Sequence, residues 1–261
     1  MRGPSAVRVE RDGGLAVVTF DSPPLNLYDL RLHAELVAAL DELESRPARA
    51  VLFRAEGRVV SGGVDVSVFA AHAGADAATE LFDGLVALSR RVERLPCPTV
   101  FAAHSLCLTW AFELALACDL ILGAESARFG LVEAVVGLTP AMGGTQRLAE
   151  RAGTGRAREL VMTGDLYDAA TLERWNVVNR VLPDENFDSS ARGLAASFAT
   201  GPTLAHDATK RVLRRYLEGG VDGADAAVGR IAGGLFATAD LQNAVRSFLA
   251  DGPGHATFEG R

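Results

Sequence analysis

Two glutamates stand alone among apolar residues in the middle of the chain. Glu113 is the only carboxylate within residues 105–117, and Glu133 closes the segment F-G-L-V-E twenty positions later. Burial raises the pKa of a carboxyl group towards the range in which it can exchange protons with a substrate. A buried glutamate can also pair with an arginine in a structural network. The residues alone leave acid–base catalysis and a structural role both open.

Trp110 lies three positions before Glu113, directly before a predicted helix over 111–117. A tryptophan in such a helix either fills the core or borders whatever site the glutamate serves. Both interpretations remain open at this point.

Several common catalytic motifs are missing. The chain has no G-x-G-x-x-G after a strand, no Walker loop and no G-x-S-x-G. Its five histidines are scattered without metal-ligand spacing, which argues against a zinc enzyme, and no local pattern supports a Ser-His-Asp triad. We therefore expect no metal site.

Charge and cysteine content limit the partners and the compartment. A formal net charge of −7 argues against general affinity for nucleic acid or an anionic membrane, both of which require a basic surface. Three cysteines without redox or metal spacing are typical of small buried residues in a reducing compartment. With no signal peptide and no apolar run of about 18 residues, the expected location is the cytoplasm.

The elements that position the two glutamates follow a repeated strand–loop–helix pattern. R-D-G-G predicts a hairpin between strands at 7–10 and 15–20, and Asp29 is a candidate N-cap for the next helix. A Gly-rich loop, S-G-G-V-D, follows the third strand. Further strands are predicted at 50–53, 98–103 and 120–122, and a further helix at 81–95.

The pattern changes to helices alone near residue 186. Helices are predicted at 189–200, 202–217, 222–236 and 241–250. Such a helical end either caps the α/β part or packs against another subunit. Without a linker or low-complexity segment, the chain is not divided into independent domains.

Four segments carry a resemblance to a known family. They are R-V-V-S-G-G-V-D-V, C-P-T-V-F-A-A-H-S-L, F-E-L-A-L-A-C-D and F-G-L-V-E-A-V-V-G-L-T-P-A-M-G-G-T-Q-R-L. In this order and spacing they resemble the enoyl-CoA hydratase/isomerase family of the crotonase superfamily. The likeness starts at D-S-P-P-L-N-L and ends in A-T-A-D…S-F-L, so it covers nearly the whole chain.

The resemblance implies an α/β fold, a crotonase-like spiral of repeated ββα units with the acyl-thioester site over residues 1–188. A C-terminal helical trimerisation region over 189–261 would follow. It also implies a cytoplasmic enzyme of fatty acid metabolism that forms a homotrimer or hexamer and binds acyl-CoA or another acyl thioester. Coenzyme A would enter only as part of the substrate, and no separate cofactor is expected.

The common chemistry of the family is stabilisation of a thioester enolate by two backbone N–H groups. By position these would be the N–H groups of Val64 and Trp110. Donors aimed in advance at the oxygen where charge develops are worth about 2.7–4 kcal/mol each. The family normally has glycine at the second position, so Trp110 would place an indole beside the thioester. Either its N–H still serves at the helix N-terminus, or the indole blocks the site.

The resemblance also assigns roles to the glutamates. Glu113 and Glu133 match the catalytic pair of the hydratases, with Glu113 activating water and Glu133 delivering or removing the α-proton. The implied reaction is the addition of water to a 2-enoyl thioester. Alternatives are an isomerase that needs only Glu133, another acyl-thioester enzyme of the fold, and a non-catalytic acyl-thioester-binding paralogue.

Substrate contacts are implied at six further positions, but the basic residues that hold coenzyme A phosphates in the family are missing. Arg31 or Arg54 could replace them, or the thioester could be carried on an acyl carrier protein. The six positions implied to contact the substrate are Leu25, Gly63, Asp65, Gly143, Phe248 and Phe258.

Overall fold

The main sheet explains the strand–loop–helix pattern. In the computed structural model, which describes residues 5–70, 72 and 74–261, six strands pair in the order β1-β2-β3-β4-β6-β9. The first pair is the predicted antiparallel hairpin, and all later pairs are parallel. The strands are β1 (Val7–Asp12), β2 (Leu15–Phe20), β3 (Ala50–Ala55), β4 (Thr99–Ala103), β6 (Leu120–Ala124) and β9 (Arg180–Leu182).

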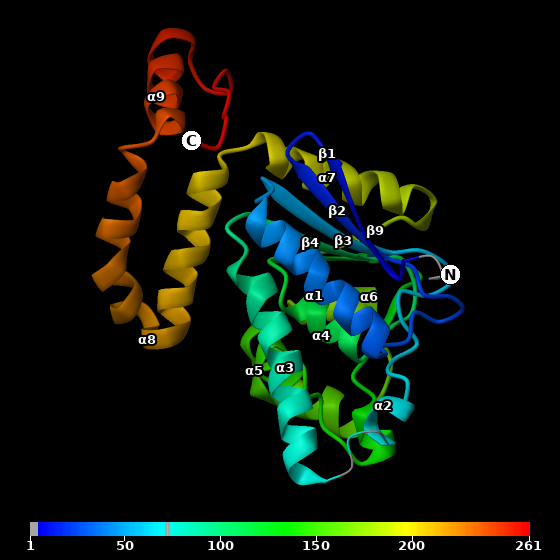
Figure 1. Cartoon of the computed structure of the whole chain (residues 1–261). Coiled ribbons are helices and arrows are strands. Elements are labelled where there is room, and N and C mark those ends of the chain that lie inside the picture. The colour runs from blue at the N-terminus through cyan, green and yellow to red at the C-terminus, as the bar shows by residue number, and fades with distance from the viewer. Residues whose placement is uncertain (1–4, 71, 73) are drawn as a thin grey trace.

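Helices cover both faces of this sheet, which is why its central strands are almost entirely apolar. In Figure 1, α7 (Phe187–Thr200) lies on one face, and α1 (Leu30–Ser45) and α4 (Trp110–Leu116) lie on the other. The Asp29 side chain accepts a hydrogen bond of 2.7 Å from the N–H of Leu32, so it caps α1 as predicted.

A second, three-stranded sheet was not predicted. It contains β5 (Cys107–Leu108), β7 (Arg128–Gly130) and β8 (Tyr167–Asp168), which are too short to show an alternating pattern. β5 leads into α4, and β7 leads into η1 (Glu133–Val136). Because β5 and β7 pair in parallel, with Leu108 opposite Gly130, the two segments that carry the glutamates start side by side.

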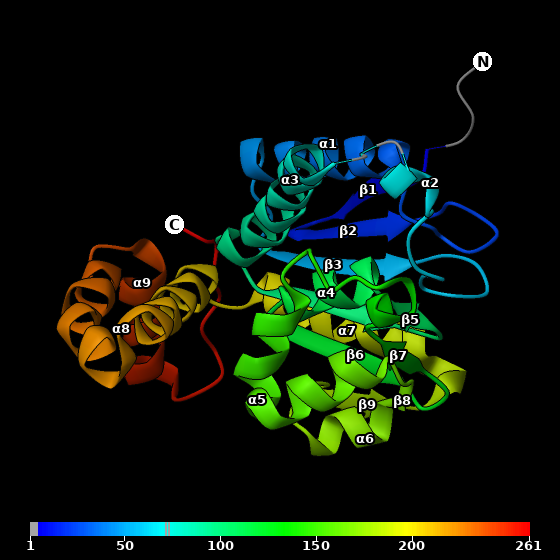
Figure 2. The same ribbon diagram turned by 90° about the horizontal axis from the view of Figure 1, so that it is seen from below.

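The C-terminal helices extend away from the sheet. α8 (Thr203–Leu235) is interrupted at Gly219 and Gly220, where the backbone is not helical, so it consists of the two predicted helical pieces. Figures 1 and 2 show α8 and α9 (Ala239–Asp251) to one side of the sheet. α7 packs on β2, β3 and β4. The part of the chain that leaves the sheet therefore begins with α8.

The remaining helices connect these parts and carry loops of the site. None of the helices in the described ranges has the length and apolar character required to cross a membrane. The remaining helices are α2 (Ser67–Ala70), α3 (Ala75–Arg94), α5 (Gly144–Thr163), α6 (Ala169–Arg174) and η2 (Asp184–Asn186).

Candidate active site

Glu113 is buried at the centre of the molecule. All seven residues of α4 are buried, and the glutamate is 3% exposed. Its Oε2 accepts hydrogen bonds from the backbone N–H groups of Met142 (2.8 Å) and Gly144 (2.7 Å). Burial, followed by repulsion from Glu133, raises the pKa of Glu113 to about 8, although the two N–H bonds act in the opposite direction.

The pair of glycines before α5 makes these hydrogen bonds possible. A Cβ on Gly144 would lie 2.7 Å from Cγ of Glu113, so only glycine lets the backbone approach this closely. Gly143 has a φ of 97°, and a Cβ there would collide with the guanidinium of Arg147. The tight turn predicted from G-G-T-Q-R-L is present, and it brings backbone donors to the glutamate.

Glu133 begins η1 and is partly buried. Its Oε2 is inaccessible to solvent and has no hydrogen-bond partner among the described residues. Burial raises the pKa of Glu133 to about 7. The charge of Glu133 is one of the causes of the raised pKa of Glu113, and the two glutamates follow the paired strands β5 and β7.

The two carboxyl groups are matched in proton affinity. The pKa of about 8 for Glu113 already includes repulsion by ionised Glu133, and without that repulsion the two values move closer together. Between about pH 7 and 8 the pair therefore holds one proton. The higher pKa of Glu113 places this proton on Glu113 more often than on Glu133. The two N–H bonds to Oε2 of Glu113 favour its ionised form and so reduce the cost of moving the proton to Glu133.

A polar network on the far side of the 142–144 turn holds its peptide groups in place. Arg147 donates to the carbonyl of Gly143 (3.0 Å) and binds Glu93 of α3 through Nε (2.7 Å) and Nη2 (2.8 Å). Ser89, also on α3, donates to the carbonyl of Met142 (2.7 Å). In the 143–144 peptide the carbonyl faces Arg147 and the N–H faces Glu113, so fixing one end orients the other. The sequence analysis missed this network because its members lie on separate helices.

Two backbone N–H groups are unpaired where the resemblance placed the oxyanion donors. Val64 lies in a bridge with Tyr28, in which Tyr28 donates to Gly63 and Asp65 donates to Tyr28. These bonds leave the N–H of Val64 unused, and Trp110 begins α4, where an N–H has no partner within the helix. Neither N–H donates a hydrogen bond to any part of the chain that the structure describes.

The indole of Trp110 is buried in the core and does not lie on an open surface. The side chain is 2% exposed and packs edge-on against Phe20, with ring centroids 5.0 Å apart. Its Nε1 donates to the carbonyl of Asn26 (3.2 Å). The tryptophan therefore belongs to the core behind the site, and its backbone borders the site.

Thr109 takes a conformation that favours glycine. Its φ of 47° and ψ of −117° lie outside the regions that residues with a Cβ ordinarily adopt. Its N–H donates to Gly130 (3.0 Å) and its carbonyl accepts from Glu113 (2.8 Å). Oγ1 is buried and has no partner among the described residues. The sequence signal for this strain was the absence of glycine in a segment where the family has a glycine run.

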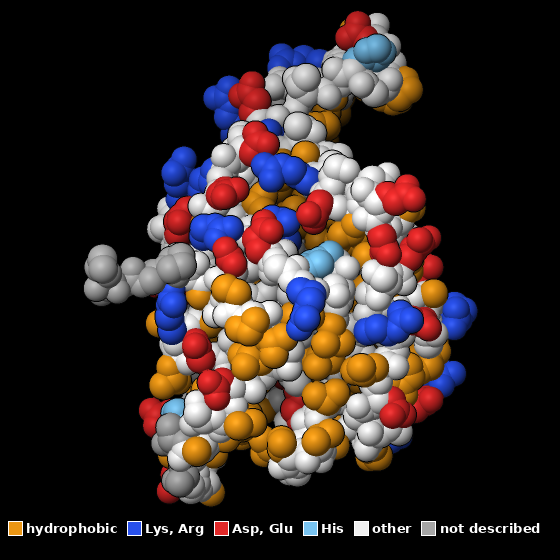
Figure 3. Space-filling view, turned by 90° about the vertical axis from the view of Figure 1, so that its right-hand side faces the viewer, with side chains coloured by type: hydrophobic (Ala, Val, Ile, Leu, Met, Phe, Trp, Pro, Cys, Tyr) orange, Lys and Arg blue, Asp and Glu red, His pale blue; other side chains and the backbone are white. Residues whose placement is uncertain are grey.

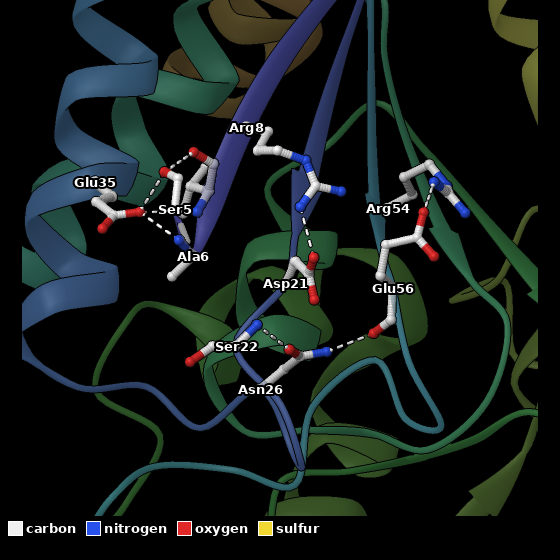
Figure 4. Close-up of polar contacts among 10 residues, drawn as sticks. Ser5, Ala6, Arg8, Asp21, Ser22, Asn26, Glu35, Arg54 and Glu56 are labelled. Atoms are coloured by element: carbon white, nitrogen blue, oxygen red, sulfur yellow. Dashed lines mark hydrogen bonds and ion pairs between the residues drawn. The ribbon is translucent and has the colours of Figure 1, made fainter. Parts of the chain in front are cut away.

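Asn26 connects the loops that follow β2 and β3. Its Oδ1 accepts from the N–H of Ser22 (2.6 Å), and its Nδ2 donates to the carbonyls of Glu56 (2.9 Å) and Val59 (3.0 Å). Figure 4 shows Asn26 between Ser22 and Glu56. Leu25 accepts from the N–H of Gly62 (2.8 Å). The predicted substrate positions Leu25, Gly63 and Asp65 are thereby held in adjoining loops.

The remaining predicted contacts do not reach the site within one chain. Phe248 is 59% exposed on α9, and Phe258 follows that helix; α9 and the C-terminus lie away from α4 (Figure 1). Arg54 forms ion pairs with Glu56 (2.5 Å) and Asp188 (3.1 Å). Arg31 pairs with Glu35 (2.9 Å).

Exposed apolar side chains border the two loops of the site. Val66 follows Asp65, and Val135 and Val136 follow Glu133; all three are more than half exposed. Figure 3 shows hydrophobic side chains gathered over the lower part of one face, with charged side chains mostly above. Such an edge suits a ligand with a hydrocarbon portion.

Comparison with known proteins identifies the family of this chain. The family model described as "Enoyl-CoA hydratase/isomerase" matches residues 10–257. The chain belongs to the enoyl-CoA hydratase/isomerase family. This match confirms the resemblance seen in the sequence, and the protein is an enzyme of this family.

Individual relatives of the family are moderately similar. The "Probable enoyl-CoA hydratase" of Bacillus subtilis is 33% identical over 197 residues, which cover 75% of this chain and 76% of the relative. The "Short-chain-enoyl-CoA hydratase" of Clostridium acetobutylicum is 28% identical over 93% of this chain and 94% of the relative.

A solved enoyl-CoA hydratase structure from Bacillus anthracis superposes with a TM-score of 0.90 at 24% identity, over 98% of this chain and 100% of the other. The predicted crotonase-like fold is therefore confirmed.

Proposed function

We propose that this enzyme adds water across the double bond of a 2-enoyl thioester. The observation that carries the proposal is the pair of glutamates. Glu113 is buried and its Oε2 accepts two backbone N–H bonds, and Glu133 is partly buried with an Oε2 that has no partner among the described residues. Their raised pKa values let the pair hold a single proton near neutral pH. One group is then a base and the other an acid, as hydration requires.

The reaction starts from the arrangement in which the shared proton lies on Glu133 and Glu113 is ionised. Ionised Glu113 takes a proton from water while the water oxygen forms a bond to Cβ of the substrate. The electron pair of the double bond moves through Cα to the thioester oxygen and gives an enolate. Protonated Glu133 then delivers its proton to Cα as the carbonyl re-forms. The sum is one water added, and the proton has moved from Glu133 to Glu113.

The N–H groups of Val64 and Trp110 would hold the enolate oxygen. Both belong to the backbone, both are unpaired among the described residues, and the second stands at a helix N-terminus, where partial positive charge favours an anion. Each such donor is worth about 2.7–4 kcal/mol of transition-state stabilisation. The chemistry uses side chains and backbone alone, so we propose that no cofactor beyond the thioester carrier takes part.

We further propose that the enzyme works as a homotrimer or hexamer through α8 and α9. These helices leave the sheet and expose large apolar residues, among them Phe236 (69%) and Leu249 (80%). Phe248 and Phe258 lie on this extension, so they would contact a carrier nucleotide only across an interface with another copy. The carrier is coenzyme A or the phosphopantetheine of an acyl carrier protein.

A spectrophotometric assay tests the proposal. Hydration removes the conjugation of crotonyl-CoA, so wild-type enzyme is expected to bleach the absorbance of the enoyl thioester. Turnover of a 3-enoyl thioester without hydration of the 2-enoyl form would identify an isomerase instead. Binding of crotonyl-CoA without any turnover would show a non-catalytic paralogue.

A further inference from the structure

The side chain of Trp110 is linked by hydrogen bonds to the loop that carries Val64. Its Nε1 donates to the carbonyl of Asn26 at 3.2 Å. The same carbonyl accepts the hydroxyl of Ser61 at 3.0 Å, and Ser61 Oγ accepts the N–H of Gly63 at 3.0 Å. An unbroken path of three hydrogen bonds therefore runs from the Trp110 indole to Gly63, the residue next to Val64.

The groups on this hydrogen-bonded path are buried away from solvent. Ser61 is fully buried, Asn26 is 3% exposed and Trp110 is 2% exposed. Hydrogen bonds among buried groups hold their geometry because no water competes for the donors and acceptors. The indole ring also contacts Tyr28, with centroids 5.5 Å apart, and the backbone of Tyr28 bonds the Gly63 carbonyl and the Asp65 N–H. Two routes thus connect one side chain to both sides of Val64.

We propose that the indole of Trp110 is a positioning group that fixes the N–H of Val64 relative to the N–H of Trp110 itself. The proposal rests on the function proposed above, in which these two N–H groups bind the enolate oxygen. Two donors serve one oxygen only if their separation is held, and they lie on loops 46 residues apart in the sequence. Trp110 contributes one donor by its backbone and anchors the loop of the other by its side chain.

The strain at Thr109 shows that this segment needs such an anchor. A residue with a Cβ persists at a φ of 47° only where its surroundings fix it on both sides. On one side the N–H of Thr109 is bonded to Gly130. On the other side, the buried indole of Trp110 holds the following residue. The peptide between Thr109 and Trp110 carries the donor N–H, so its orientation depends on both attachments.

Trp110→Phe tests the proposal because it keeps the backbone N–H and an aromatic ring but removes the indole N–H. We expect kcat for crotonyl-CoA hydration to fall by about 10- to 100-fold, the scale of a misplaced catalytic geometry, with KM changed less than twofold. Trp175→Phe is the matched control. Trp175 packs on Tyr167 outside the site, with ring centroids 4.9 Å apart. The kcat of the Trp175→Phe variant is therefore expected to equal that of wild type.

A second readout does not depend on turnover. Acetoacetyl-CoA bound in the site forms an enolate with its own ultraviolet absorbance, and an aligned pair of donors raises the enolate fraction at fixed pH. Trp110→Phe is expected to lower this fraction without weakening total binding. Ser61→Ala, which breaks the same path at another point, is expected to do the same and serves if Trp110→Phe does not fold.

The results separate the two proposals. A lowered enolate fraction in both site variants supports the positioning role, even if wild type hydrates nothing and the proposed reaction is wrong. Wild-type kcat and enolate fraction in folded Trp110→Phe or Ser61→Ala overturn the positioning role and leave the reaction standing. A wild type that forms no enolate overturns both. A drop in thermal stability alone, equal to that of Trp175→Phe, identifies the indole as core packing and also overturns the proposal.

Discussion

At the scale of single residues, the chemistry depends on two glutamate carboxyl groups that lie in different surroundings. Glu113 is buried and Glu133 is partly buried, and burial raises both pKa values. Glu113 meets two backbone donors from a distant segment, because Gly144 lets the chain approach it within hydrogen-bond distance. The two N–H bonds partly offset the effect of burial on the pKa of Glu113.

Burial of Glu113 makes stability depend on pH. Its folded pKa of about 8 lies above the ordinary 4.5, so between these values the folded state holds a proton that the unfolded state has lost. The free energy of unfolding should therefore fall as pH rises from about 4.5 to 8. Glu113→Gln removes this titration. Compared with wild type, the variant should gain on the order of 3–4 kcal/mol more in unfolding free energy at pH 8.5 than at pH 5. Urea unfolding of wild type and Glu113→Gln at both pH values measures this effect. The same difference in unfolding free energy between the two proteins at pH 5 and at pH 8.5 would contradict the assigned pKa.

Thr109→Gly tests the backbone strain. Glycine adopts a φ of 47° freely, and the substitution removes a buried hydroxyl without a partner among the described residues. We expect a gain of about 1 kcal/mol in the free energy of unfolding, after the loss of the methyl group is offset. Thr99→Gly, at a buried threonine in β4, is the control and should destabilise. A destabilised Thr109→Gly protein would show that the conformation is not strained.

At the scale of elements, the short sheet β5–β7–β8 brings the two glutamates together. Parallel pairing of β5 and β7 places the starts of α4 and η1 next to each other. α3 then supports the 142–144 turn through Glu93 and Ser89. The catalytic pair is therefore held by elements that are far apart in the chain.

Arg147→Met tests this support. The guanidinium lowers the pKa of Glu113 through its charge, and its bond to the Gly143 carbonyl orients the N–H of Gly144. Without it the pKa of Glu113 rises, so the ascending limb of kcat/KM against pH should move to higher pH. Arg147→Lys keeps the charge and should recover part of the shift. Arg151→Met, at an arginine one turn further along α5 that binds the Cys118 carbonyl, should leave the limb in place; a shift equal to that of Arg147→Met would contradict the role.

The predictability of these elements follows from their length. The strands β1–β4, the Asp29 cap and the break in α8 were found because apolar periodicity, turn residues and glycines mark them locally. β5, β7 and β8 have two or three residues each and carry no period. Glu113 and Glu133 could be selected by resemblance to the family. The donors from Met142 and Gly144 could not, because backbone groups leave no mark on residue type.

At the scale of the whole molecule, the described chain is a compact sheet structure with a helical extension. The extension exposes large apolar side chains to solvent, which is typical of an interface between subunits. The sequence pattern left open whether this region caps its own chain or meets another. The position of α8 and α9 beside the sheet favours the second interpretation (Figure 2).

Leu249→Glu tests the assembly. The side chain is 80% exposed on α9, so the substitution should leave the fold of one chain intact. A charge buried in an interface is costly, and we expect the trimer or hexamer to dissociate in analytical ultracentrifugation. Ser45→Glu, at an exposed position at the end of α1, is the control for added charge and should leave the assembly unchanged. A wild type that sediments as a monomer would contradict the proposed assembly.

The central claim is that Glu113 and Glu133 act as one acid–base unit in hydration. Its most direct test is kcat for crotonyl-CoA hydration in Glu113→Gln, Glu133→Gln and the double variant. Each single change should lower kcat by about 100- to 10,000-fold, and the double variant should be no worse than the slower single one, since a unit is lost once. Near-wild-type hydration by either single variant, or losses that multiply in the double variant, would contradict the account.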